Sequence, residues 1–264
     1  MTASLSATRV SAASGARSVA ALMFVATLVA AWFASAGHVP AYVLPPPAEV
    51  FSATLAFASS PQRLPHLFAT LGHIGSAIVI SFVMGALLAF AAHYLRWSAP
   101  AIHGRLSPFL SAFSGIGWTL LAVIWFGVSS FTVVFTIVAV LLPFAIVNLR
   151  EGLLSLDAEL LEMGRSFGRD RWRSWLRLVV PALIPFAAAT LRIMFGVAWK
   201  VTLTAELFGG GRGLGYVINL ARQDYDTPTI FAVILFIIVA VTLADRLIFA
   251  PIERFSTRQF GGAS

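Results

Sequence analysis

The 264-residue chain contains no cysteine, and only 11% of its residues are charged. Without cysteine it can form neither a disulfide nor a thiolate metal site. Charged side chains make up roughly a quarter of a soluble globular domain, so this composition excludes that class. Apolar residues instead make up 59% of the chain, and its mean hydropathy is +0.88. The sequence therefore predicts an integral membrane protein.

The chain carries no recognisable apparatus for hydrolytic or nucleotide chemistry. No H-E-x-x-H and no metal-spaced cluster of carboxylates and histidines occurs in it. Residues 164–168 read Gly-Arg-Ser-Phe-Gly and match the spacing G-x-S-x-G, but they follow a predicted amphipathic helix and not the strand that a nucleophile elbow requires. The glycine run at residues 209–215 resembles a phosphate-binding loop only superficially, because the Lys and Ser/Thr of a P-loop are missing. We interpret this run as a flexible connector. We expect no catalytic residue, no metal and no cofactor in this chain.

Four long intervals contain no charged side chain, and a fifth region is apolar apart from three ionisable residues. A hydrocarbon core of about 30 Å needs roughly 20 apolar residues per helix, and continuous apolar runs favour helices over the alternating strands of a barrel. The longest interval breaks at residues 127–130, which predicts a helical hairpin. We expect an all-α, polytopic bundle of about six membrane spans. The candidate spans are residues 19–36, 71–92, 107–126, 131–147, 185–208 and 229–250.

The arginines predict the orientation, because basic loops are retained on the cytoplasmic side of a membrane. A cytoplasmic N-terminus leaves only Arg63, Arg212 and Arg222 on the outer side, so the formal charge of +7 is a topology signal and not a sign of nucleic-acid binding. Ala34-Ser-Ala36 resembles a signal cleavage site, but the preceding apolar core is longer than that of a signal peptide, so we expect a retained helix. The predicted segments are a cytoplasmic tail (1–18), a first span (19–36), an extracytoplasmic segment (37–70), a core of five spans (71–254) and a cytoplasmic tail (255–264).

Shorter elements are predicted between the spans. Prolines favour extended and turn structure over residues 38–65, with a short helix near 48–58. Residues 209–222 form an outer, glycine-rich element that becomes helical near 216–222. Residues 156–181 form a charged, amphipathic island, in which a helix from Asp157 ends at Gly168 and a second helix ends at Pro181. One interpretation of this island is a pair of interfacial helices whose arginines bind anionic lipid.

The spacing within the island supports a second interpretation. Glu162-Met-Gly164, then Gly168, then Leu178-Val-Val-Pro181 resembles the Glu-Ala-Ala…Gly…Ile-x-Leu-Pro signature of binding-protein-dependent ABC transporter permeases, and the chain is most similar to the nitrate, sulfonate and taurine type. The departures include Met163 and Gly164 in place of Ala, Gly117 in place of an Ile-Pro pair, and His73 where Arg is common. Supporting stretches lie at residues 44–50, 124–127, 143–148, 191–193, 205–206 and 213–216.

The resemblance implies the fold of a type I ABC importer permease with cytoplasmic coupling helices, in the bacterial inner membrane. It implies a permease dimer around a pathway for a small, anionic solute, an outer solute-binding protein, and a pair of separate ATPase subunits that hold ATP and Mg. The ATPase-docking candidates are Glu159, Glu162, Met163, Gly164, Gly168, Arg169 and Pro181. The candidates that face the binding protein are Arg212, Tyr216 and Arg222.

Ionisable groups within spans are costly and usually face protein or water. Lys200, the only lysine, is interpreted either as a positive pathway site for an anion or as a structural group that pairs or snorkels. Glu206 and Trp118 are further pathway candidates, whereas Arg192 is expected to be structural. Two histidines, His66 and His73, are expected to form hydrogen bonds between helices and receive no functional role.

Two other function classes remain open from the sequence. A secondary transporter or channel with an interfacial lipid-binding loop would need a coupling-ion site or selectivity ring, commonly with inverted repeats, and none is visible. A membrane anchor would explain the spans but not the spacing of the island at residues 156–181. These residues determine neither the transported solute nor whether the permease forms a homodimer or a heterodimer.

Overall fold

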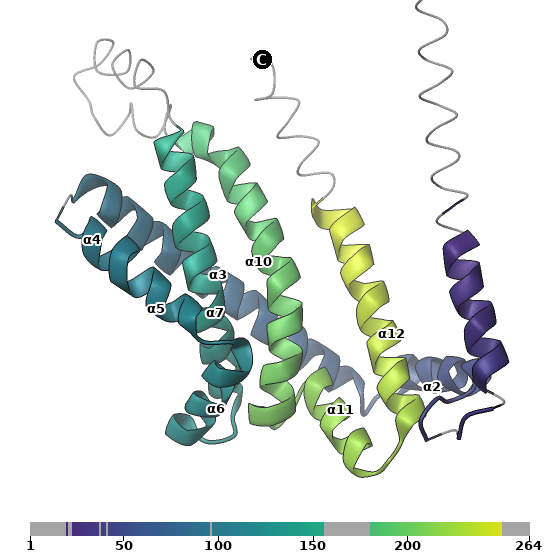
Figure 1. The fold of residues 1–264 in the computed structure, drawn as a ribbon. Coiled ribbons are helices and arrows are strands. Elements are labelled where there is room, and N and C mark those ends of the chain that lie inside the picture. Colours follow the sequence, from purple (N-terminus) through teal and green to yellow (C-terminus); the bar gives the residue numbers. More distant parts are fainter. Residues whose placement is uncertain are drawn as a thin grey trace, which may run out of the picture.

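The computed structural model describes residues 20, 23–36, 38–40, 42–95, 97–155 and 180–249, and these residues form helices and turns without a strand. Figure 1 shows α7, α10 and α12 roughly side by side, with α3 crossing obliquely behind α7 and α10. The elements are an apolar helix at Met23–Ala36, α2 (Pro47–Ser59), α3 (Leu64–Tyr94), α4 (Ala99–Ala101), the π-helical turn η1 (Ile102–Leu106), α5 (Ser107–Ala112), α6 (Gly115–Phe126), α7 (Ser130–Leu154), α10 (Val180–Gly209), α11 (Leu214–Gln223), α12 (Thr227–Ala244) and the π-helical turn η3 (Asp245–Phe249).

The predicted spans coincide with apolar helices. Among the described residues, α3, α7, α10 and the segment Thr227–Leu247 are each long and apolar enough to cross a membrane. The first predicted span falls on the shorter helix Met23–Ala36. Helix α3 begins at Leu64 and not near residue 71, with Pro65 in its first turn, where a missing N–H costs nothing. The predicted all-helical membrane bundle is therefore confirmed. Several of its helices are longer than the spans predicted from hydropathy.

The third predicted span, residues 107–126, is not one continuous helix. Ala99–Ala112 and Gly115–Phe126 are both helical, but they meet at 86°. At the bend Phe113 and Ser114 are extended, and the Ser114 side chain accepts a hydrogen bond from the N–H of Gly117 at 3.3 Å. Ser114 therefore caps a new helix, α6, where α5 has ended. No charged residue marks the bend, so the uncharged run did not reveal it.

The predicted hairpin break after α6 is confirmed. Helix α6 ends at Phe126, and Gly127 follows with φ +71°, a conformation that favours glycine. Ser129 then caps α7 by accepting a hydrogen bond from the N–H of Thr132 at 3.2 Å. The short helices predicted near residues 48–58 and 216–222 are also present, as α2 and α11.

Helix α7 lies at the centre of the bundle, packed between α3 and α10. Small residues make these contacts close. A Cβ added at Gly85 of α3 would overlap the Cβ of Ala145 on α7, and one added at Gly152 of α7 would lie 2.8 Å from the ring of Phe186 on α10. Membrane helices associate mainly by such close packing, because lipid tails are as apolar as the side chains.

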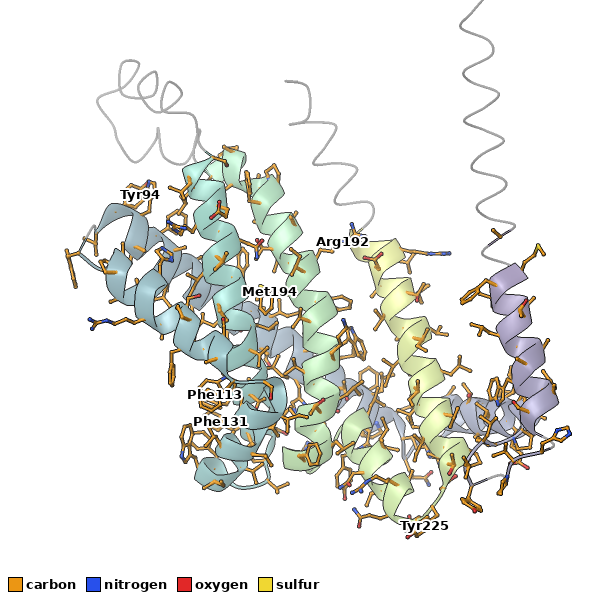
Figure 2. All side chains as sticks on the ribbon, in the orientation of Figure 1. Tyr94, Phe113, Phe131, Arg192, Met194 and Tyr225 are labelled. Atoms are coloured by element: carbon orange, nitrogen blue, oxygen red, sulfur yellow. The ribbon has the colours of Figure 1, made fainter. Side chains whose placement is uncertain are left out.

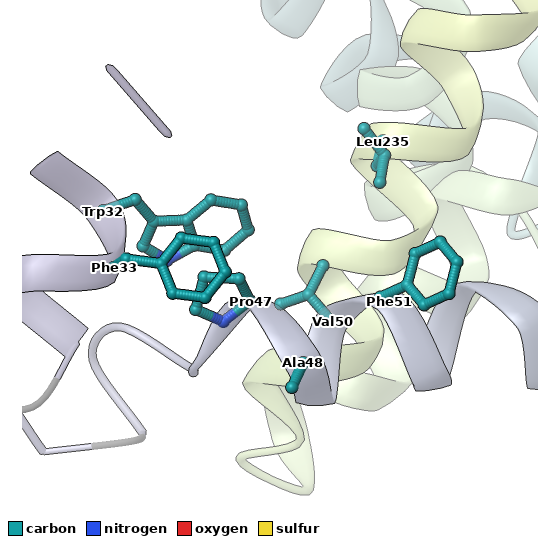
Figure 3. A pocket seen from close by; sticks show the side chains of 7 residues that line it. All are labelled: Trp32, Phe33, Pro47, Ala48, Val50, Phe51 and Leu235. Carbon is teal, nitrogen blue, oxygen red and sulfur yellow. The ribbon is translucent and has the colours of Figure 1, made fainter. Parts of the chain in front are cut away.

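A separate set of contacts joins the N-terminal part of the chain to α12. Trp32 of the Met23–Ala36 helix stacks on Phe231 of α12 at 6.1 Å, and Phe57 of α2 lies 5.7 Å from Phe236 of α12. The indole N–H of Trp32 donates to the carbonyl oxygen of Pro45 at 3.1 Å. Figure 3 shows the apolar groove between these elements, lined by Trp32, Phe33, Pro47, Ala48, Val50, Phe51 and Leu235.

The helix ends fall into two groups. The last turn of α7, the first turn of α10 and the last turn of α12 lie at the upper end in Figure 1. The turn between α6 and α7, helix α2, and the passage from α10 through α11 into α12 lie at the lower end. The charged island thus connects the end of α7 to the start of α10, and both of these helix ends lie opposite to α11.

We expect Gly85→Val to destabilise the bundle by about 1–3 kcal/mol, because overpacking a close contact forces the backbones apart. Gly72→Val, on the same helix, is the matched control, since a Cβ there meets no atom within 4 Å. Thermal unfolding of the purified variants in detergent compares them. Equal melting temperatures would contradict the close contact between α3 and α7.

Candidate functional site

Most of the predicted ATPase-docking residues lie outside the described residues: Glu159, Glu162, Met163, Gly164, Gly168 and Arg169. Pro181 is described, and it lies in α10. The two helices that flank the island are packed together at this end, because Gly152 of α7 lies against Leu183 and Phe186 of α10. The island is therefore joined to a closely packed pair of core helices.

Lys200 lies on the outward face of α10. It is exposed, whereas its neighbours Ala198 and Trp199 are buried, and it forms no ion pair with any described residue. Gly196, one turn earlier on the same face, has open space around it. Thr204, one turn later, donates to the backbone oxygen of Lys200 at 3.2 Å. This face of α10 thus carries a free cation between small and polar residues, and a pathway role for Lys200 stays a prediction.

Trp118 is buried inside the bend between α5 and α6. Its indole N–H donates to the carbonyl oxygen of Leu110 at 3.1 Å, and its ring lies 5.5 Å from that of Phe113 and 6.3 Å from that of Phe135. Phe113 marks this aromatic group in Figure 2, near the lower end of α7. These contacts hold the two halves of the bent segment together. The pathway role predicted for Trp118 stays a prediction.

Glu206 is fully buried near the lower end of α10, with 0% of its side chain exposed. Its Oε2 atom accepts a hydrogen bond from the Thr70 hydroxyl at 2.9 Å and another from the N–H of Gly215 at 2.9 Å. Its Oε1 atom lies 2.8 Å from Nδ1 of His73. The carboxylate therefore joins α3, α10 and α11, and its role in the pathway stays a prediction.

The glycine-rich run at residues 209–215 is packed except at Gly211, which has open space around it, and this packing contradicts our interpretation of the run as a flexible connector. Gly213 has φ +117°, and a Cβ there would overlap the Glu206 carboxylate. A Cβ at Gly215 would overlap the carbonyl oxygen of Leu203, and one at Gly210 would lie 2.8 Å from the Cα of Glu206. These glycines are needed because the chain turns tightly around a buried side chain.

The predicted binding-protein-facing residues gather around α11. Arg212 and Arg222 are exposed, and a guanidinium nitrogen of Arg222 donates to the side-chain oxygen of Asn219 at 3.1 Å. Tyr216 is half-buried, because its ring stacks on that of His66 at 5.8 Å. The structure brings these residues to one end of the bundle, and contact with a binding protein stays a prediction.

Sequence reasoning gave His66 and His73 no functional role and did not single out Thr70. All three lie on one face of α3, at spacings of four and three residues, and all three contact the buried group around Glu206 or the start of α11. His73 forms a hydrogen bond between helices, as expected. Polar residues at spacings of four and three within an otherwise apolar helix could have indicated from the sequence that these three side chains share a site.

Arg192 joins α10 to the end of α12. Its Nε lies 3.1 Å from Oδ1 of Asp245, and one of its terminal nitrogens lies 3.2 Å from Oδ2. Figure 2 places Arg192 near the upper end of α12. Two parallel hydrogen bonds fix the orientation of both side chains, which agrees with the structural role expected for Arg192.

A bundle of apolar helices that are long enough to cross a membrane, with a packed helical element at one end, fits a membrane transport protein. The model of the family described as "Binding-protein-dependent transport system inner membrane component" matches residues 18–254, and the chain belongs to this family. It is therefore a multi-pass membrane protein of the inner membrane and the permease component of an ABC transporter.

Relatives of known name agree with this assignment. The formylaminopyrimidine transport permease protein ThiX of Halalkalibacterium halodurans is 30% identical, over 88% of this chain and 91% of its own. The taurine transport system permease protein TauC of Escherichia coli (strain K12) is 27% identical, over 76% of this chain and 75% of its own. Both are named as transport permeases and not as enzymes.

A solved structure shows the same fold. The inward-facing MetNI methionine ABC transporter matches with a TM-score of 0.59 and 16% identity, covering 75% of this chain and 100% of the matched chain. The expected fold, that of an ABC importer permease, is therefore confirmed.

We expect the charge reversal Arg192→Asp to lower the thermal stability, because it places two carboxylates side by side. The double variant Arg192→Asp/Asp245→Arg should recover most of the loss, because it restores a pair of opposite charges. Both side chains are about 40% exposed, so the recovery should be no more than about 1 kcal/mol. Melting curves of the single and double variants test this, and strictly additive losses would contradict a direct interaction.

Proposed function

We propose that this chain forms the translocation pathway of an ATP-driven importer whose ATPase resides on separate subunits. The observation that carries the proposal is the position of the two helix ends that the island at residues 156–181 connects. The end of α7 and the start of α10 pack through Gly152 and Phe186, and both lie at the end of the bundle opposite to α11. A partner bound to the island could therefore act on two core helices together.

The proposed partners follow from this division into two ends. A pair of ABC ATPase subunits, which hold ATP and Mg, docks on the island at the cytoplasmic side, where both chain termini also lie. An extracytoplasmic solute-binding protein docks at the opposite end near Arg212, Tyr216 and Arg222. A second copy of this chain completes the pathway, and membrane lipid surrounds the remaining apolar surface. The excess of arginine on the island side supports this orientation.

The proposed substrate is a small, anionic solute. The relatives ThiX and TauC are named for chemically different solutes, so the support comes from Lys200. An exposed lysine with no ion pair among the described residues, on a span between Gly196 and Thr204, is a costly arrangement unless it faces water or a partner charge. A pathway that carries anions would supply Lys200 with water and with a partner of opposite charge.

The docking of the ATPase is tested by co-purification of the tagged chain with its candidate ATPase. Glu162→Lys and Gly168→Asp change the island without changing a span. We expect both variants to lose the ATPase, because a reversed or added charge is desolvated at the contact. Glu49→Lys, an exposed position on α2, is the matched control and should retain it.

Two results would contradict this part of the proposal. Equal recovery of the ATPase from wild type and both island variants would exclude docking at Glu162 and Gly168. Absence of the ATPase from the wild-type preparation, together with binding of the island to anionic vesicles, would favour the interfacial lipid-binding interpretation.

Lys200 is tested by uptake into proteoliposomes that contain the complete transporter and its cognate binding protein. We expect Lys200→Met to reduce uptake about tenfold, because a charge-assisted contact contributes about 1.5–3 kcal/mol. Lys200→Arg keeps the charge and should retain most of the activity. Uptake by Lys200→Met equal to that of the wild type would exclude an anion site at this residue.

A further inference from the structure

The first N–H groups of α11 are bonded by side chains from two other helices. Gly213 N–H donates to Nδ1 of His66 at 3.2 Å, Leu214 N–H to the Thr70 hydroxyl at 2.8 Å, and Gly215 N–H to Oε2 of Glu206 at 2.9 Å. The first turn of any helix lacks partners for such groups, and the preceding residue usually caps it. Gly213 holds that position here and has no side chain, so α11 depends on α3 and α10 for its caps.

Glu206 is the centre of this arrangement. An ionised carboxylate only accepts hydrogen bonds, and Glu206 accepts them from Thr70, from Gly215 and from Nδ1 of His73. Its negative charge also lies at the N-terminus of α11, where the helix dipole favours an anion. Removing the carboxylate would leave several donors buried without an acceptor, which is more costly than losing an exposed contact.

The packing allows the start of α11 little room to move. Gly213 and Gly215 lie directly against the side chain of Glu206, so close that neither position has space for a Cβ. Gly210 N–H also donates to the backbone oxygen of Glu206 at 3.1 Å. The end of α10, the turn and the start of α11 thus form one packed unit.

Helix α10 connects this unit to the opposite end of the bundle. Its first described residue, Val180, lies at the end of the island, and the helix ends at Gly209, three residues beyond Glu206. Figure 1 shows α10 running without interruption between the two ends, with α11 packed beside its lower end. A displacement of the α10 start would be carried along the helix to whatever is fixed at its other end.

We propose that Glu206 is a positioning residue that makes α11 a rigid extension of α10. A displacement of the island would then also displace α11, and a binding protein that docks at α11 would displace the island. The coupling part of this inference rests on the proposed function, since it requires an ATPase at one end and a binding protein at the other. The rigid joint itself is a property of the permease alone.

The joint is tested on the permease alone, by distance measurement between spin labels. The chain has no cysteine, so Ile193→Cys and Gln223→Cys place labels only on exposed positions of α10 and α11. We expect a narrow distance distribution in this background and a broad one after Glu206→Ala. Glu49→Gln, which removes an exposed carboxylate on α2, is the control and should leave the distribution narrow.

Two further variants separate a loosened joint from misfolding. Thr70→Val keeps the volume of the side chain but removes the hydroxyl that contacts both Glu206 and Leu214, so it should also broaden the distribution. Glu206→Gln keeps one acceptor oxygen, and its amide can donate to His73, so it should stay close to the wild type. Distributions for Glu206→Ala and Thr70→Val as narrow as the wild type would overturn the proposed joint.

The coupling is tested with the full complex of permease, ATPase and loaded binding protein in nanodiscs. We expect Glu206→Ala to reduce the stimulation by the binding protein about 5- to 10-fold, when the stimulated rate is divided by the basal rate of the same variant; this is the low end of the usual coupling between two sites. Glu206→Gln should restore most of the stimulation. A merely structural role would lower recovery of the complex and leave the stimulation of the remaining complex unchanged, and that result would overturn the coupling role.

The two experiments fail in different ways. A wild-type permease that does not assemble with the ATPase would refute the proposed function and the coupling role with it. The label distances would still decide whether Glu206 fixes α11 to α10. A confirmed joint with normal stimulation in Glu206→Ala would leave the importer function standing and reject only the proposed route of coupling.

Discussion

A carboxylate buried among membrane helices must find its hydrogen-bond partners within the protein, because lipid supplies none and an unpaired charge there is very costly. Glu206 meets this constraint by drawing together α3, α10 and the start of α11. The glycines that follow it are a consequence, since Gly213 and Gly215 must let the backbone approach the carboxylate closely. The geometry of this end of the bundle therefore depends on one buried side chain.

The opposite end is built on a different kind of contact. There Gly152 of α7 admits the ring of Phe186, so the two helices that flank the island lie close together without a buried charge. Helix α10 belongs to both ends, and this gives the permease a continuous element between the island and α11. Lys200 lies between the two ends, on the face of α10 that the bundle leaves open.

The membrane helices could be predicted because the physical requirement is local: a run of about 20 apolar residues suffices for a span. Caps and turns with local signals were also accessible, such as the break after Phe126 that Gly127 marks. The bend at Ser114 was missed although its signal is local, because a single serine in an apolar run is a weak cue beside strong hydropathy. The glycine run at residues 209–215 was misinterpreted because glycine permits both free and closely packed backbone.

The sequence by itself determined the class of protein, the membrane helices and the family, since composition, apolar run length and motif spacing are properties of the chain in one dimension. Only the tertiary structure decided which of the ionisable residues within the spans are paired. Thr70 and Glu206 lie 136 positions apart, and His73 and Glu206 lie 133 apart. Residue spacing places a side chain on one face of its helix. Its partner depends on how the helices cross and on how deeply the side chain is buried, and the packing of the whole bundle sets both.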